Sequence, residues 1–220
     1  MAYVSDTETA IASARNFRIF LEYLALDTNA ERIHIVGYSA GTRLVITSLM
    51  QLALLHSGKT KSEIQAELKI GNTILISSDF DGAVFAGYAL EGLLNVPATL
   101  TLYASAKDEA LGYSNWLFSR TRLGQIEASL SNDAKEFLFH FDNLYPIDVS
   151  QAPGTDLGDG HQYFRQSPWV SSDILSTLLY DLRPSERGLV SNNGSPIWEF
   201  PENYVEKLRS ATLKSISESP

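Results

Sequence analysis

A serine between two glycines is the first feature of this chain that could do chemistry. The segment Gly37-Tyr38-Ser39-Ala40-Gly41 matches the pattern G-x-S-x-G. An apolar run at residues 33–36 precedes it, and a helical pattern of leucines and valines follows at once. Between a strand and a helix, this pattern holds a serine hydroxyl out at the carboxyl end of the strand. We therefore predict that Ser39 is a nucleophile.

The residue types in this turn suit a sharp reversal of the chain. The small residues Gly37 and Gly41 let the strand end and the helix start approach each other, while the central serine takes a strained conformation. The backbone N–H of Ala40 then lies at a helix N-terminus, which favours negative charge. We predict that this N–H stabilises an oxyanion.

A nucleophilic serine needs a base, and the chain has four histidines. We interpret His34 as structural, because it lies within the strand before the turn. His56 falls at the end of the next helix, and His140 falls within the last predicted strand. His161 lies in a loop after that strand, from which an imidazole can reach the strand ends. We predict His161 as the general base, with a surface loop histidine as the alternative.

An acid must orient that base. Asp108 follows the third predicted strand, and Asp79 and Asp81 follow the second. All three carboxylates are expected at the same edge of the sheet as Ser39, although acids in such positions also cap the following helix. The order Ser39, Asp108, His161 matches the chain order in α/β-hydrolases. We favour Asp108 as the acid and keep Asp79 as the alternative.

Strand and helix patterns alternate along the chain. We expect strands at residues 33–36, 70–78, 98–104 and 137–141, with 143–149 as an extension of the last one. We expect helices at residues 6–26, from the turn to about 56, within 59–68, and at 85–94, 110–118, 171–182 and 204–216, with loops at 151–162 and 184–201. This alternation predicts a single α/β domain over residues 1–220, a three-layer sandwich with a mostly parallel sheet. In such sheets ligands bind at the carboxyl ends of the strands.

Composition excludes several classes of protein. The chain of 220 residues carries a net charge of −9, which disfavours a nucleic-acid partner. It has no cysteine for a disulfide or a thiolate metal site. No run of residues reaches the roughly 18 apolar residues of a membrane span, and no signal-peptide layout begins the chain. The default expectation is a cytoplasmic protein.

Other sites are not indicated by the sequence. The acids at residues 79–81 and 156–159 lack the spacing of a calcium loop, and no glycine-rich phosphate loop with a lysine is present. We expect neither a metal nor a cofactor.

Four segments together resemble one family of hydrolases. They are residues 33–41, 74–81, 102–111 and 160–164, within a resemblance that spans about residues 10–182. The chain resembles the bacterial esterase/lipase-like α/β-hydrolases of unknown function known as DUF900. The resemblance implies the C-terminal portion of an α/β-hydrolase fold and a hydrolase without a cofactor, with Ser39, Asp108 and His161 as its triad. It does not imply a particular substrate.

The chain departs from that pattern at its start. Such hydrolases place several strands before the nucleophile strand, whereas here we expect only one helix before it, so the domain is expected to be N-terminally incomplete. The outer edge of the strand at residues 33–36 would then be unpaired and apolar, a place for a second copy or another partner chain. The oxyanion hole would lack its second N–H donor, because no His-Gly motif is present.

These observations favour one function and leave two others open. The favoured one is hydrolysis of small carboxylic esters through an acyl-enzyme on Ser39. A catalytically impaired fragment that acts as a binding or assembly module is the second. The third is an acyltransferase with the same residues, in which another alcohol takes the place of water.

Overall fold

The protein is built on a parallel sheet. The computed structural model describes residues 9, 12–108, 123–124, 131–192 and 194–218. The sheet contains β1 (Ile33–Tyr38), β2 (Ile70–Ile76), β3 (Thr99–Ala104), β4 (Leu144–Asp148) and β5 (Trp198–Glu199). The order of these five strands across the sheet is β1-β2-β3-β4-β5, and each adjacent pair is parallel. The carboxyl ends of all five strands therefore meet at one edge.

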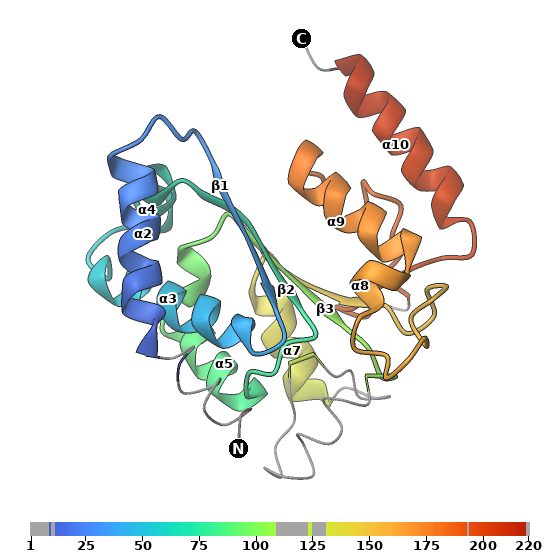
Figure 1. Cartoon of the computed structure of the whole chain (residues 1–220), viewed down its shortest axis with the longest axis horizontal. Helices are drawn as coiled ribbons and strands as arrows, with labels where there is room; N and C mark the ends of the chain where they lie inside the picture. The colour runs from blue at the N-terminus through green and yellow to red at the C-terminus, as the bar shows by residue number, and fades with distance from the viewer. Residues whose placement is uncertain (1–8, 10–11, 109–122, 125–130, 193, 219–220) are drawn as a thin grey trace.

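Helices cover both faces of this sheet (Figure 1). One layer contains α2 (Ala14–Leu26), α3 (Gly41–Leu55), α4 (Lys61–Leu68), α5 (Gly82–Leu90), the 3₁₀ turn η1 (Leu93–Asn95) and α7 (Asn132–His140). The other contains α8 (Tyr163–Gln166), α9 (Pro168–Tyr180) and α10 (Tyr204–Glu218). The expected three-layer α/β architecture with a parallel sheet is confirmed. No described helix is both long enough and apolar enough to span a membrane.

The position of β2 inside the sheet explains why its sequence is almost continuously apolar. All seven of its residues are buried. Leu75 belongs to the core shared with α3, whereas Ile74 and Ile76 belong to the core shared with α9 and α10. Because successive side chains of a strand point to opposite faces, a strand covered on both sides needs apolar residues at every position.

The prediction of a strand at residues 137–141 is wrong. These residues lie in or just after the helix α7, and the fourth strand is β4, which falls inside the expected extension at 143–149. Ser131 caps the helix by accepting a hydrogen bond from the N–H of Ala134, 3.2 Å away. The rings of Phe137 and Phe141 also meet at 5.2 Å. That i,i+4 spacing brings two side chains together on one helical face. The apolar residues here therefore follow the helical period of 3.6 residues and not the two-residue alternation of a strand.

Two further elements differ from the sequence interpretation. The strand β5 lies inside the expected loop at 184–201. The helix α8 lies between the loop expected at 151–162 and the helix expected at 171–182. Neither spans more than four residues, so neither shows a period that a pattern can reveal. The helix expected at 110–118 and the first residues of the helix expected at 6–26 lie outside the described residues.

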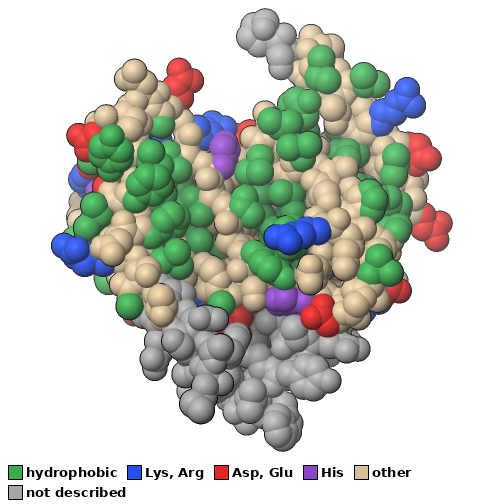
Figure 2. Space-filling view, viewed as in Figure 1, with side chains coloured by type: hydrophobic (Ala, Val, Ile, Leu, Met, Phe, Trp, Pro, Cys, Tyr) green, Lys and Arg blue, Asp and Glu red, His purple; other side chains and the backbone are tan. Residues whose placement is uncertain are grey.

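The strand that precedes Ser39 lies at the edge of the sheet. β1 pairs with β2, and no described strand pairs with its other side. Its burial alternates, and Val36 is 49% exposed. Figure 2 shows hydrophobic side chains exposed on both sides of this edge, over α2 and over α9. The exposed apolar side chains there include Phe20, Tyr23, Leu175 and Leu179.

A buried ion pair holds the second helical layer to the sheet. Arg187 donates to both carboxylate oxygens of Asp173, at 2.8 and 3.0 Å. The hydroxyls of Tyr103 on β3 and Tyr204 on α10 donate to the same carboxylate. Burial and the neighbouring carboxylate raise the pKa of Tyr103 well above its usual range, so its phenol remains a donor. Every one of these side chains is at most 1% exposed.

We predict that Arg187→Met destabilises the protein by about 3–5 kcal/mol, because it leaves the Asp173 carboxylate buried without its cation. The free energy of unfolding from urea denaturation measures this. The matched control is Arg32→Gln, which breaks an ion pair with Asp181 whose side chains are 51% and 41% exposed. That change should cost less than about 1 kcal/mol. Equal losses in the two variants would contradict the prediction.

Candidate active site

The turn after β1 has the geometry of a nucleophile elbow. β1 ends at Tyr38 and α3 begins at Gly41, so Ser39 and Ala40 make the whole connection. Ser39 has a φ of 52°, in the left-handed region that a residue with a side chain rarely adopts. Its N–H donates to the carbonyl of Ile76 at 3.0 Å, and its carbonyl accepts from the hydroxyl of Thr42 at 2.6 Å. These bonds to the next strand and the new helix hold the strained residue in place.

The two glycines of the motif differ in what they contribute. A Cβ on Gly37 would lie 3.1 Å from a methyl group of Val45 and 3.4 Å from Leu75, so this glycine is needed for close packing of the strand against α3. A Cβ on Gly41 would meet no described atom within 4 Å. The expectation that both glycines relieve a steric clash is therefore correct for Gly37 and wrong for Gly41.

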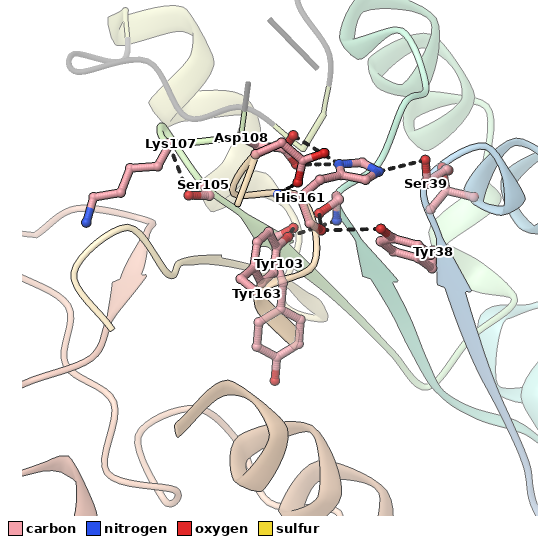
Figure 3. A network of polar contacts seen from close by, with 11 residues as sticks. Tyr38, Ser39, Tyr103, Ser105, Lys107, Asp108, His161 and Tyr163 are labelled. Carbon is pink, nitrogen blue, oxygen red and sulfur yellow. Dashed lines mark hydrogen bonds and ion pairs between the residues drawn. The ribbon is translucent and has the colours of Figure 1, made fainter. Parts of the chain in front are cut away.

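Ser39, His161 and Asp108 form one chain of hydrogen bonds (Figure 3). The Nε2 atom of His161 lies 2.9 Å from the Oγ of Ser39. Its Nδ1 atom lies 2.9 and 3.0 Å from the two carboxylate oxygens of Asp108. Because an ionised carboxylate only accepts, Nδ1 carries the proton and Nε2 is free to accept from the serine hydroxyl. That tautomer is the one a general base at Nε2 requires.

Burial around these groups is graded. The side chain of Asp108 is fully buried and that of His161 is 14% exposed, while Ser39 is partly exposed. A buried carboxylate in a low-dielectric setting holds an imidazole firmly, and a partly exposed serine remains within reach of a substrate.

The alternative acid, Asp79, faces a different partner. Its carboxylate accepts from the Nε of Arg43 at 2.9 Å, and its backbone carbonyl accepts from the same guanidinium at 2.9 Å. Asp81 caps α5 by accepting from the N–H groups of Ala83 and Val84. Of the three candidate acids, the structure brings only Asp108 to His161.

The other three histidines lie away from this chain of bonds. His34 accepts a hydrogen bond from the N–H of Asn72, 3.0 Å away, at an irregularity in the pairing of β1 with β2. His56 ends α3, where its Nδ1 lies 2.9 Å from the carbonyl of Leu52. His140, expected in a strand, is instead the last residue of α7. None of the three takes part in the bonds around Ser39.

The predicted oxyanion donor lies next to the predicted nucleophile. Ala40 occupies the N-cap position of α3, directly after Ser39. The first N–H groups of a helix have no partner within that helix and point away from its N-terminus. The position of Ala40 therefore suits the predicted role. Among the described residues, no group of three acidic or histidine side chains is arranged to hold a metal ion.

The two loops that carry Asp108 and His161 meet at a glycine. Gly160 has a φ of 67°, and a Cβ there would lie 2.2 Å from the backbone carbonyl of Lys107. Only glycine fits such an approach. His161 follows Gly160 in the chain, and Asp108 follows Lys107. The contact between the two loops therefore sets the distance between the carboxylate of Asp108 and the imidazole of His161.

Sequence reasoning missed the groups that hold His161 itself. Its backbone carbonyl accepts from the hydroxyls of Ser77, at 3.1 Å, and Tyr38, at 3.4 Å. The ring of Tyr38 also lies 5.1 Å from the imidazole, centroid to centroid. Ser77 lies directly after β2, but no local pattern in the sequence connects it with a loop more than 80 residues later.

The sheet is parallel and has helices on both faces. An elbow serine follows one strand, an acid follows another and a histidine follows a third. This combination defines the class of α/β-hydrolases. The model of one family in that class, described as alpha/beta hydrolase of unknown function (DUF900), matches residues 1–179. The chain belongs to this family. No curated protein matches the chain, and no solved structure does.

We predict that Gly160→Ala separates the two loops, because the added methyl group collides with the Lys107 carbonyl. Stability should fall by more than about 1 kcal/mol, and the reactivity of Ser39 should fall with it. The control is Gly158→Ala, which has a similar φ of 65° but no described atom within 4 Å of the new Cβ. It should show the backbone cost alone. Thermal unfolding and the rate of labelling by a fluorophosphonate measure both effects, and identical behaviour of the two variants would refute this account.

Proposed function

We propose that this protein is a serine hydrolase that cleaves carboxylic esters through an acyl-enzyme intermediate. The observation that carries the proposal is the unbroken path of hydrogen bonds from the carboxylate of Asp108 through His161 to the hydroxyl of Ser39. Membership of an α/β-hydrolase family supports the same class of reaction.

Each residue has one role in the proposed reaction. Ser39 Oγ attacks the ester carbonyl as His161 Nε2 takes its proton, and the Ala40 N–H stabilises the oxyanion of the tetrahedral intermediate. His161 then gives the proton to the departing alcohol, which leaves an acyl group on Ser39. Water, deprotonated by His161, attacks that acyl group and releases the acid. Asp108 stabilises the imidazolium formed in each half of the reaction.

The side chains beside the imidazole favour an apolar substituent on the ester. Tyr38 and Phe164 are partly exposed, and their rings pack together at 4.8 Å next to His161. Phe80 and Tyr163 are buried in the cores, and Trp169 packs against Phe200 and Tyr204. Tyr38 and Phe164 are therefore the aromatic side chains that support a contact with an acyl or alkyl group.

The proposal predicts a single covalent adduct when the purified chain reacts with a fluorophosphonate probe. Peptide mapping should locate the adduct on Ser39, and Ser39→Ala and His161→Ala should not form it. Asp108→Asn should slow labelling by on the order of 10³–10⁴-fold, because the amide no longer holds the imidazole in the required tautomer. Asp79→Asn is the matched carboxylate control and should label at close to the original rate once folded. A folded chain that forms no adduct would refute the proposal.

The fate of the acyl group separates hydrolysis from acyl transfer. In a transferase an added alcohol intercepts the same acyl-enzyme, so ester exchange would outrun release of the free acid. We propose water as the acceptor. Product analysis with a 4-nitrophenyl ester and a range of added alcohols tests this choice.

The open edge of β1 favours a second candidate function, assembly with another copy of the chain. No described strand pairs with the outer side of β1, and apolar side chains flank it. Such an edge is a template for pairing, and two copies of β1 can pair across a two-fold axis. We expect a mass that rises with concentration in light scattering, and a monomer when Val36→Lys places a charge on the edge. Leu90→Lys, at an apolar residue on α5 that is 68% exposed, is the control. A monomer at all concentrations would exclude this assembly.

A further inference from the structure

The backbone carbonyl of His161 is held by side chains from two neighbouring strands. Tyr38 reaches it from the end of β1, as the dashed line in Figure 3 shows, and Ser77 reaches it from the residue after β2. The bond from Ser77 is the shorter of the two, at 3.1 Å. Burial raises the pKa of Tyr38, with the acids Asp108 and Asp159 adding to the shift, so that phenol also stays a donor.

Ser77 makes a second link to the same segment through its backbone. Its N–H donates to the hydroxyl of Tyr163 at 2.8 Å, and that hydroxyl donates to the carbonyl of Tyr103 on β3 at 2.8 Å. Tyr163 is fully buried and lies two residues after His161. One residue thus binds the histidine loop at two points, through its side chain to residue 161 and through its main chain to residue 163.

The backbone of Ser77 is strained in a way that these bonds explain. It has a φ of 46° and is completely buried. A serine in the left-handed region is unfavourable relative to glycine, and such strain persists where the surrounding structure over-determines it. Glycine would relieve the strain but would lack the hydroxyl. The residue type at this position therefore points to a need for the hydroxyl.

Among the described residues, the other contacts of the loop around His161 include the close approach of Gly160 to the Lys107 carbonyl and a bond from the N–H of Gly160 to the carbonyl of Leu157 at 3.2 Å. The preceding residue, Gly160, has a φ of 67°. The N–H of His161 donates to the carboxylate of Asp159, an exposed residue in the same loop. Regular helix begins only at Tyr163. Since an imidazole must lie within hydrogen-bond distance of both Ser39 and Asp108, a shift of its backbone by about 1 Å would break one of those contacts.

We propose that Ser77 is a positioning residue for the general base: its hydroxyl anchors the His161 carbonyl and so keeps the imidazole between Ser39 and Asp108. This inference rests on the proposed function, because it assigns a role within the same site.

Two substitutions at this one position separate positioning from stability. Both Ser77→Ala and Ser77→Gly remove the hydroxyl, but only glycine relieves the strain at positive φ. We expect kcat to fall by about 10- to 100-fold in both, with KM for a 4-nitrophenyl ester nearly unchanged, because the transition state alone loses the aligned base. We expect the melting temperature of Ser77→Gly to exceed that of Ser77→Ala. A merely structural serine would instead make the more stable glycine variant the more active one.

A direct view of the imidazole comes from histidine labelled with ¹⁵N. The Nδ1 proton that His161 shares with Asp108 should give a low-field resonance, assigned by its loss in His161→Ala. We expect this signal to broaden or shift in both Ser77 variants. Ser48→Ala is the matched control, because Ser48 is a fully buried serine whose hydroxyl bonds the carbonyls of Ala14 and Leu44, away from the site. Its kcat and its imidazole signal should be those of the original protein.

The outcomes distinguish this inference from the function on which it rests. If the original chain hydrolyses the ester and labels on Ser39 while both Ser77 variants keep its kcat, the positioning role is wrong and the proposed function stands. If the folded original chain neither hydrolyses nor labels, the proposed function is wrong and the positioning role falls with it. Slow turnover in both Ser77 variants, with the glycine variant the more stable, supports the inference.

Discussion

The hydrogen bond between His161 and Ser39 joins residues 122 positions apart in the chain, and most of the architecture serves to make it possible. Parallel strands bring their carboxyl ends to one edge, so segments that follow different strands become neighbours. Ser39 follows β1, Asp108 follows β3 and His161 follows β4. The geometry of this chain of hydrogen bonds is thus a consequence of strand direction first and of side-chain contacts second.

The buried polar groups behind the site connect its loops to the rest of the core. Tyr103 on β3 is the clearest link. Its hydroxyl donates to Asp173 in the buried ion pair, and its carbonyl accepts from Tyr163, two residues after His161. A carboxylate and a guanidinium in the interior are costly to bury and are retained only with their hydrogen bonds complete. That network therefore fixes the second helical layer and, through Tyr103, the strand against which the histidine loop rests.

The nucleophile strand has two properties that compete. β1 must present Ser39 at its end, and it also lies at an edge of the described sheet, where Val36 is 49% exposed. Its inner side is well determined, because Gly37 packs tightly against Val45 and the elbow bonds to Ile76. On its outer side no described strand pairs with it, and such an edge is a template for another strand. The proposed catalysis and the proposed assembly would for this reason both depend on one element.

The sequence alone determined what depends on local pattern: the elbow around Ser39, the apolar strands β2 and β3, the α/β class, and the choice of His161 among the histidines, with Asp108 favoured over Asp79. Local pattern failed at residues 137–141, where four apolar residues and His140 fit either period and the cap at Ser131 favours a helix. Only the tertiary structure decided that Asp79 pairs with Arg43 while Asp108 meets His161, because both acids end strands and only their position across the sheet differs. Only the tertiary structure revealed Ser77, since a positive φ and a contact across 84 residues leave no periodic trace in a sequence.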